Sequence, residues 1–221
     1  MNQNTKKHKV AQSVLEYINN GEILGIGSGS TVNILIEYLA QVKNKIRNVV
    51  SSSIKSTELL MENGFEVSQL RDVGKLSKYI DGADEVNKYL QMIKGGGGAL
   101  TREKILAHNC EKFICIVDES KKVDVLGGFP LPIEVIPMAQ SSVALELIKI
   151  GGRPVLRQDF KSDNGNIILD VHNLEILEPL KLEQMLNNIP GVVTNGIFAM
   201  DHADILLSSS ELDVEVSKPI V

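Results

Sequence analysis

The sequence predicts an α/β fold with two parts: a parallel sheet covered by helices, and a smaller ferredoxin-like α+β domain. Up to residue 117, short apolar runs alternate with helical segments, which is the order of strands and helices in a parallel sheet. Residues 133–197 change to the order strand, helix, strand, strand, helix, strand, the split βαβ arrangement of ferredoxin-like domains. An apolar run at residues 203–207 is left over, and we expect it to return as a strand to the first sheet.

The first part of the chain carries clear helix and strand signals. Residues 5–17 have apolar side chains at helical spacing, and residues 22–26 form a short apolar run with a glycine near its end, which indicates a strand. Ser30 or Thr31 is expected to cap the second helix, and Gly64 to follow the third at its C′ position. The other expected elements are helices at residues 30–42, 56–63 and 101–109 and strands at 48–51, 79–80, 89–93 and 113–117.

A turn-rich linker, residues 127–132, separates the two parts. The sequence therefore predicts a larger domain of residues 1–127 plus 203–221 and a small domain of residues 128–202. Within the small domain, residues 163–166 read Asp-Asn-Gly-Asn, a strong hairpin turn between the middle strands. The expected elements of the small domain are helices at 141–150 and 180–188 and strands at 133–137, 155–158, 167–171 and 191–197.

Composition limits the partners and the location. The 221 residues are 43% hydrophobic and 23% charged, with a mean hydropathy of +0.02, which is typical of a soluble globular protein. A net charge of −5, the absence of Trp and 4% aromatic residues argue against nucleic acid as a partner. No apolar run is long enough to span a membrane, and no signal peptide is visible. The spacing of Cys110 and Cys115, with no histidine cluster, argues against zinc, and we expect a cytoplasmic protein.

The most informative stretch is residues 94–103, Lys-Gly-Gly-Gly-Gly-Ala-Leu-Thr-Arg-Glu. Four consecutive glycines separate Lys94 from the first turn of an expected helix, which carries Glu103. Glycines let a ligand approach main-chain N–H groups, and the helix start adds further donors. A carboxylate beside cationic and N–H groups is what proton abstraction next to a carbonyl requires. The alternative is a glycine-rich surface turn with a solvated lysine and a glutamate that stabilises the helix start.

A second glycine-rich turn, residues 25–31, follows the first strand and opens the next helix. Its flexible backbone, N–H groups and hydroxyls suit a phosphate at the positive end of the helix dipole. Ser30 stands where a dinucleotide-binding fingerprint requires glycine, and the second strand ends in serines 51–53 rather than in an acidic ribose ligand. A monophosphate ester therefore fits better than a dinucleotide, and a turn without a ligand is the alternative.

Charged residues follow two other expected strands. Asp81 and Asp84 come after one of them, and at the carboxyl edge of the sheet they can hydrogen-bond sugar hydroxyls or share proton transfers. Lys121 follows a buried strand and can bring positive charge to the same edge for a phosphate, and Lys7 in the first helix is a weaker candidate. The alternatives are a solvated acidic turn and a surface charge run. A divalent metal at Asp81 and Asp84 is a further alternative, but no histidine is close in sequence, and we predict no metal site.

These motifs resemble those of ribose-5-phosphate isomerase of the A type, in the same order along nearly the whole chain. The resemblance implies a Rossmann-like domain with an inserted ferredoxin-like domain. It also implies an isomerase without metal or cofactor that interconverts D-ribose 5-phosphate and D-ribulose 5-phosphate through a cis-enediolate, in the non-oxidative pentose phosphate pathway. A homodimer or a dimer of dimers is expected. The segments that carry the resemblance are residues 25–31, 52–56, 81–85, 94–104, 118–121, 131–139, 152–157, 162–166 and 196–199.

The resemblance implies a role for each candidate residue. Glu103 is the base, and Lys94 and the glycine loop hold the oxyanion. The residues implied at the substrate are Gly95, Gly96 and Gly97 in the loop, Asp81, Gly82, Ala83 and Asp84 at the sugar, and Ser28, Gly29, Ser30, Thr31, Lys121 and, more weakly, Lys7 at the phosphate end.

Two other classes of function stay open. The first is a non-catalytic sugar-phosphate sensor of the kind attached to transcription regulators. Such a regulator needs a DNA-binding helix-turn-helix, and the roughly twenty residues before the first strand are too few for one. An NADP-dependent oxidoreductase is the other, with residues 51–55 at the 2′-phosphate. A cofactor titration followed by calorimetry separates this enzyme from an isomerase.

Overall fold

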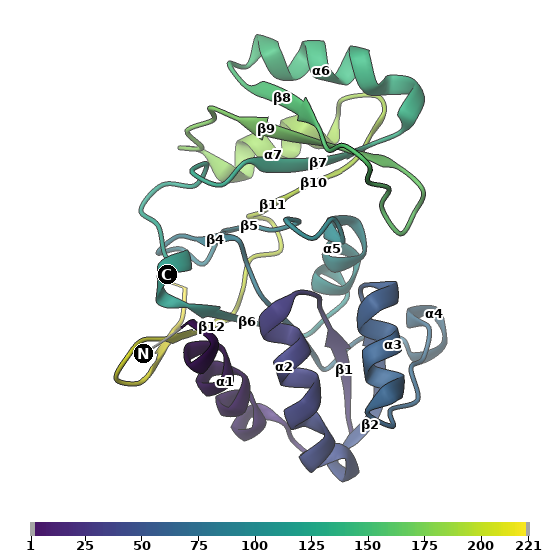
Figure 1. The fold of residues 1–221 in the computed structure, drawn as a ribbon, viewed down its shortest axis with the longest axis vertical. Helices are drawn as coiled ribbons and strands as arrows, with labels where there is room; N and C mark the ends of the chain where they lie inside the picture. The colour runs from purple at the N-terminus through teal and green to yellow at the C-terminus, as the bar shows by residue number, and fades with distance from the viewer. Residues whose placement is uncertain (1–2, 220–221) are drawn as a thin grey trace. The chain divides into compact units, whose positions relative to one another are not determined.

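The computed structural model describes residues 3–219, which form two compact units (Figure 1). Unit 1 consists of the residues up to Gly82, residues 105–121 and the residues from Ala203 onward. Unit 2 consists of residues 83–104 and 122–202, and is thus made by two insertions into unit 1. None of the helices in the described part of the chain is both long enough and apolar enough to cross a membrane.

Unit 1 is built on a six-stranded sheet with the strand order β13-β12-β6-β3-β1-β2. The edge strand β13 is antiparallel to its neighbour, and the other strands are parallel. The strand order changes direction between β1 and β3, and the carboxyl ends at such a switch point are where open parallel sheets bind ligands. The strands are β1 (Glu22–Ile26), β2 (Ile46–Ser51), β3 (Lys78–Asp81), β6 (Phe113–Asp118), β12 (Ile205–Ser209) and β13 (Val214–Ser217).

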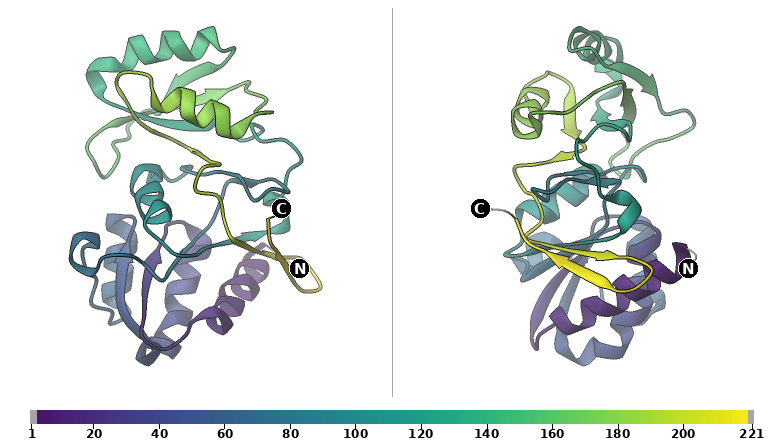
Figure 2. Two further views of the ribbon diagram at one scale, coloured as in Figure 1. Left: turned by 180° about the vertical axis from the view of Figure 1, so that it is seen from behind. Right: turned by 90° about the vertical axis from the view of Figure 1, so that its left-hand side faces the viewer.

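Side-chain alternation along β1 divides the core of unit 1 between the two faces of the sheet. Leu24 and Ile26 pack with α1 and α2, whereas a Cβ at Gly25 would lie 3.6 Å from Leu106 of α5. Figure 2 shows the β12–β13 hairpin alongside α1. The helices are α1 (Gln3–Ser13), η1 (Val14–Tyr17), α2 (Ser30–Leu39), η2 (Ala40–Lys45), α3 (Ile54–Glu62), α4 (Leu70–Val73), η3 (Glu119–Lys121) and α5 (Leu100–His108), whose residues up to Lys104 belong to unit 2.

The expected strands and long helices of unit 1 are present, and one cap differs. Gly29, with φ +104°, holds the cap position of α2, and no side chain caps the helix, so the expected capping by Ser30 or Thr31 is wrong. The Ser30 hydroxyl instead accepts a hydrogen bond from Lys7. The strand expected at residues 203–207 is β12, and it returns to the first sheet beside β6 as predicted. α4 and β13 were not predicted, because four-residue elements carry too little periodicity.

Unit 2 contains a four-stranded antiparallel sheet with the order β10-β7-β9-β8. Along the chain these strands and two helices follow the order β7, α6, β8, β9, α7, β10, which confirms the predicted split βαβ. A separate three-stranded sheet has the order β11-β5-β4. The elements are β4 (Glu85–Val86), β5 (Met92–Ile93), β7 (Leu131–Val135), η4 (Pro137–Ala139), α6 (Gln140–Lys149), β8 (Arg153–Leu156), β9 (Ile167–His172), α7 (Pro179–Asn187), β10 (Val192–Asn195) and β11 (Ile197–Phe198).

β7 connects the core of unit 2 to the segment that precedes α5. Its odd-numbered residues pack with α6 and α7, so its even-numbered residues, Pro132 and Glu134, face the other way. A Cβ at Gly95 would lie 3.3 Å from Pro132, and Glu134 accepts a hydrogen bond from the hydroxyl of Thr101 at the start of α5. This strand therefore supports both the glycine loop and the first turn of α5.

Two strands of unit 2 are shorter than expected. The strand expected over residues 191–197 breaks at Gly196, and its two parts join different sheets as β10 and β11. A Cβ at Gly196 would lie 2.4 Å from the carbonyl oxygen of Lys94, so glycine lets the two backbones meet. The strand expected over residues 89–93 is reduced to β5, because the side chain of Asn87 binds the backbone N–H groups of the turn before it.

The compact units differ from the predicted domains in two segments. Residues 83–104 and 122–127 belong to unit 2, whereas the prediction placed both in the large domain. The first segment joins unit 2 because its strands β4 and β5 form one sheet with β11. The domain boundaries themselves stay a prediction.

Candidate active site

The glycine loop, residues 95–98, joins β5 to α5 in unit 2. Gly95 has φ +103° and Gly98 has φ +83°, in the left-handed region that glycine adopts at low cost. A Cβ at Gly98 would lie 2.1 Å from Cζ of Phe160, whose ring packs directly on the loop. The loop therefore needs glycine at these positions.

Lys94, directly before this loop, and Glu103, in the first turn of α5, form a buried ion pair. Lys94 Nζ lies 3.3 Å from Glu103 Oε2, and the two side chains are only 3% and 5% exposed. The main-chain N–H of Lys94 donates to the carbonyl oxygen of Gly196 at 2.9 Å, and Nζ lies 5.4 Å from the centre of the Phe198 ring. Opposite charges interact strongly where water is excluded. The pair places a candidate base and a cation side by side.

Asp84 binds the glycine loop directly. Its Oδ2 accepts a hydrogen bond from the N–H of Gly96 at 2.8 Å, and its own N–H donates to the carbonyl oxygen of Ile93 at 2.8 Å. A Cβ at Gly96 would lie 2.7 Å from Asp84 Oδ1, so glycine permits this contact. Asp84 is only half-buried, and a polar ligand can reach its carboxylate.

In unit 1, the glycine-rich turn of residues 25–31, called the phosphate loop below, begins at the end of β1 and ends in the first turn of α2. Gly29 and Ser30 are exposed, whereas Ser28 and Thr31 are half-buried. The first N–H groups of α2 have no carbonyl partner within the helix and suit an anion. Lys7 Nζ on α1 lies 2.9 Å from Ser30 Oγ, so a cation also reaches the loop. The loop, the helix start and the lysine together suit a phosphate ester.

Asp81, fully buried at the end of β3, holds the phosphate loop in place. Its Oδ1 accepts hydrogen bonds from the N–H groups of Ser28 (3.0 Å) and Gly82 (2.7 Å), and its Oδ2 accepts one from the Tyr79 hydroxyl. A Cβ at Gly27 would lie 1.9 Å from Asp81 Cγ, so glycine makes room for the carboxylate. Contact between Asp81 and the sugar hydroxyls stays a prediction.

Lys121 lies in η3, directly after β6. Within residues 3–219 it makes no hydrogen bond or ion pair with the phosphate loop, and its role at a phosphate stays a prediction. Nearby, burial tends to raise the pKa of Asp118, but hydrogen bonds from Ser120 outweigh it and hold this pKa below its usual value. The end of β6 thus carries a carboxylate kept ionised at neutral pH.

Among residues 3–219, no three His, Cys, Asp or Glu side chains are grouped so that they could hold a metal ion.

The predicted site residues lie in both units, and the division falls between Gly82 and Ala83. Unit 1 contains Lys7, Ser28, Gly29, Ser30, Thr31, Asp81, Gly82 and Lys121, and unit 2 contains Ala83, Asp84, Lys94, Gly95, Gly96, Gly97 and Glu103.

A buried polar network around Glu134 was not predicted. The fully buried Glu134 carboxylate accepts hydrogen bonds from the Thr101 hydroxyl, from Ser162 Oγ at 2.7 Å and from Asn166 Nδ2 at 2.8 Å. Because Thr101 lies in the first turn of α5, the network fixes the turn that carries Glu103. Two features of the sequence indicate this network. Glu134 lies between two apolar residues of an expected strand, and the hairpin turn at residues 163–166 is polar, although the prediction assigns these residues a turn and no further role.

A second buried ion pair lies next to the first. Lys104 Nζ donates to Glu183 Oε1 and to the carbonyl oxygen of Ile197, both at 2.6 Å, and lies 4.7 Å from the centre of the Phe198 ring. Burial lowers the pKa of Lys104, and the charge of Glu183 opposes this effect. Lys104 pairs with Glu183 and not with Glu103, so these two residues serve as matched controls.

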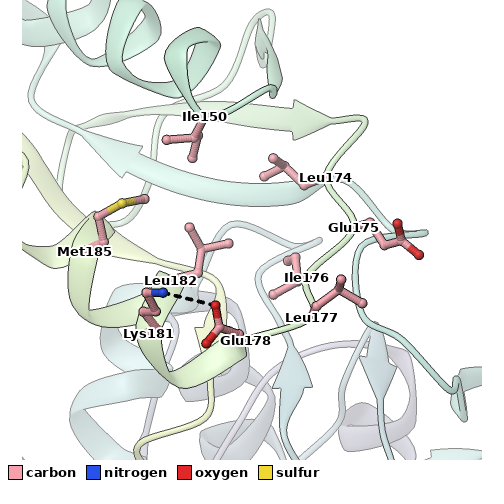
Figure 3. A pocket seen from close by; sticks show the side chains of 9 residues that line it. All are labelled: Ile150, Leu174, Glu175, Ile176, Leu177, Glu178, Lys181, Leu182 and Met185. Atoms are coloured by element: carbon pink, nitrogen blue, oxygen red, sulfur yellow. Dashed lines mark hydrogen bonds and ion pairs between the residues drawn. The ribbon is translucent and has the colours of Figure 1, made fainter.

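Unit 2 also has a surface pocket of about 270 Å³ (Figure 3). Aliphatic side chains line most of it, and the exposed Lys181–Glu178 ion pair (3.1 Å) lies at its edge. None of the predicted site residues lines this pocket. It is therefore not the candidate active site.

Comparison with known proteins gives a family match over most of the chain and full-length structural matches. The sequence matches the family described as ribose 5-phosphate isomerase A (phosphoriboisomerase A) over residues 48–211. A crystal structure of ribose 5 phosphate isomerase A from Neisseria gonorrhoeae is 48% identical, with a TM-score of 0.97 over 100% of this chain and 99% of that chain. Ribose 5-phosphate isomerase A from Methanocaldococcus jannaschii is 35% identical (TM-score 0.93; 98% and 100% covered). A D-ribose-5-phosphate isomerase in complex with phospho-erythronic acid is 37% identical (TM-score 0.94; 99% and 100% covered).

The matched family and the full-length relatives are sugar-phosphate isomerases, and this is the class of enzyme to which the chain belongs. The fold of the N. gonorrhoeae relative confirms the mixed α/β class predicted from the sequence. The chain belongs to the ribose 5-phosphate isomerase A family.

Proposed function

We propose that Glu103 is the base with which this chain, as a ribose-5-phosphate isomerase, interconverts D-ribose 5-phosphate and D-ribulose 5-phosphate. The activity is that of the family. The observation that carries the assignment of the base is the buried Lys94–Glu103 pair on the glycine loop. An aldose–ketose isomerisation needs one base, a cation and N–H donors, and these groups supply all three.

The reaction moves one proton between two carbons. Glu103 takes the proton from C2 of the open-chain aldose, and the electrons of that C–H bond form the C1–C2 double bond of a cis-enediolate. Negative charge develops on O1, where Lys94 and the N–H groups of the glycine loop stabilise it. Glu103 then returns the proton to C1, and the O2 proton passes to O1 through a neighbouring carboxyl or water, which yields the ketose. The half-buried Asp84 is our candidate for this carboxyl.

The relative solved with phospho-erythronic acid supports the cis-enediolate of the proposed reaction. That ligand has a phosphate ester at one end and a carboxyl group at the other. A planar carboxylate with two oxygens resembles O1 and O2 of a cis-enediolate, and a site complementary to the intermediate binds such a mimic well.

The phosphate loop is expected to contribute binding. We expect Thr31→Ala to raise KM for ribose 5-phosphate about 10- to 100-fold with little change in kcat, because a hydrogen bond to a charged group is worth about 1.5–3 kcal/mol. Steady-state kinetics measure both constants. Thr57→Ala is the matched control, since Thr57 lies at the start of α3 and bonds only to Ser53 O (2.9 Å) among the described residues. Equal rates on ribose and on its 5-phosphate would exclude a phosphate site here.

The isomerase activity itself is tested by a coupled assay of ribulose 5-phosphate formation. We expect turnover of ribose 5-phosphate to persist after exhaustive dialysis against EDTA, because the proposed chemistry uses a carboxylate and a lysine. Activity that chelation abolishes and a divalent ion restores would contradict this prediction. It would also move Asp81 and Asp84 to the role of metal ligands.

The assembly and location of the protein are further proposals. We infer a homodimer or a dimer of dimers, because the resemblance to the A-type isomerases implies one. Sedimentation at micromolar concentration tests it. A cytoplasmic location is proposed on the same resemblance.

A further inference from the structure

Arg157, directly after β8, binds the glycine loop of unit 2. Its guanidinium donates to the carbonyl oxygen of Gly96 at 3.1 Å and to that of Gly95 through two nitrogens, both at 3.3 Å. On its other side, Nε and Nη2 bind the Asp170 carboxylate of β9 at 2.8 and 2.5 Å. The Phe160 ring, which packs on the loop, lies 5.2 Å from the guanidinium carbon. One side chain therefore ties the loop to β9.

These hydrogen bonds fix the direction of two peptide groups. In a trans peptide the N–H points away from the carbonyl oxygen, and the described residues contain no cis peptide. The Gly95–Gly96 peptide is held at both ends, its oxygen by Arg157 and its N–H by Asp84. In the Gly96–Gly97 peptide, Arg157 binds the oxygen, so the N–H of the exposed Gly97 points away from the guanidinium.

The Gly97 N–H is a suitable donor for a ligand. Among residues 3–219 it has no hydrogen-bond partner. A cation on the carbonyl oxygen polarises the peptide and strengthens its N–H as a donor. A donor that is held in position before the reaction needs no reorganisation when charge develops on the substrate.

We propose that Arg157, oriented by Asp170, is a positioning residue that aims the N–H of Gly97 at the developing enediolate oxygen. The inference rests on the proposed function, which assigns the oxyanion to the glycine loop. That negative charge exists only after the proton begins to leave C2, so a misplaced donor lowers kcat more than it weakens substrate binding. Arginine suits the task better than lysine because its planar fork binds a carboxylate and two carbonyl oxygens at once.

Arg157→Lys tests the inference, because it keeps the charge and removes the fork. We expect kcat to fall about 10- to 100-fold, the effect of a displacement of roughly 1 Å in a catalytic group, with KM close to the wild-type value. Asp170→Asn should shift kcat in the same direction by a smaller factor. The matched control is Arg153→Lys, since Arg153 is an exposed arginine on the adjacent strand β8 and should leave both constants unchanged.

A second measurement does not depend on turnover. In a ¹⁵N-labelled protein, the amide signals of Gly96 and Gly97 should shift, and their hydrogen exchange should become faster, in Arg157→Lys but not in Arg153→Lys. Unchanged amide signals and an unchanged kcat in the folded variant overturn the inference. A change confined to KM, or a loss of kcat that only follows the loss of folded protein, overturns it as well.

The two proposals fail in distinguishable ways. A wild-type protein that does not isomerise ribose 5-phosphate refutes the proposed function, whatever the variants do. A wild-type protein that isomerises it, with Arg157→Lys equally active, refutes only the positioning role. If Arg157→Lys does not fold, Asp170→Asn decides the question by the same criteria.

Discussion

Replacing Glu103 by Gln should lower kcat by about 10²–10⁴-fold, the usual contribution of a positioned general base. Glutamine keeps the size and hydrogen-bonding capacity of the side chain but cannot accept the C2 proton, so KM should change little. Glu103→Asp should also lose about 10²-fold, because the shorter side chain withdraws the carboxylate by more than 1 Å from its reacting position. Steady-state kinetics with ribose 5-phosphate measure these effects.

Glu183→Gln is the matched control for Glu103→Gln. Glu183 of α7 is also a buried carboxylate, only 2% exposed, and it pairs with Lys104, the residue that follows Glu103 in α5. Its replacement leaves Lys104 without its ionic partner and should lower the melting temperature, but kcat should stay near the wild-type value. If both variants lose activity equally, the loss reflects a broken buried pair and not a missing base.

Isotope exchange gives a sharper test of the base. In D₂O, the wild-type protein should introduce deuterium at the carbons that exchange the proton, and Glu103→Gln should lose this exchange together with turnover. A variant that keeps near-wild-type exchange would show that another group takes the proton. Asp84, which binds the Gly96 N–H, is then the next candidate.

Lys94→Met should lower kcat by about 10²–10³-fold, the scale of losing one oxyanion partner. Methionine preserves much of the apolar stem beside the Phe198 ring but removes the positive charge. The charge of Lys94 interacts more strongly with the enediolate than with the neutral aldehyde, so KM should change less than kcat. Circular dichroism and the melting temperature should accompany the kinetics, because the variant leaves Glu103 buried without its cation.

Lys104→Met is the control for this second variant. It neutralises another buried lysine beside the same Phe198 ring, one that pairs with Glu183 and not with Glu103. Stability should change, whereas kcat should stay near the wild-type value. An effect of Lys94→Met on KM alone would place Lys94 at a contact made equally in the ground state and the transition state.

The sequence by itself determined most of the elements and the candidate for the main site. The alternation of strands and helices, and then the order β7, α6, β8, β9, α7, β10, can be read from local periodicity, because side chains repeat every 2 residues in a strand and about every 3.6 in a helix. The lysine, the glycines and the glutamate of the main site lie within ten residues of one another, residues 94–103. A site so compact in sequence leaves a signature that needs no tertiary information.

Only the tertiary structure decided which polar groups hold these loops. Asp81 binds Ser28 across 53 residues of sequence, Arg157 binds Gly95 across 62, and Glu134 binds Thr101 across 33. Nothing in the local pattern around these side chains marks their partners, since a hydrogen bond depends on distance in space and not on spacing in sequence. The break at Gly196 has the same cause, because it depends on how closely the backbone of Lys94 approaches. Local periodicity specifies the elements, whereas the packing of distant segments specifies the contacts that orient the reacting groups.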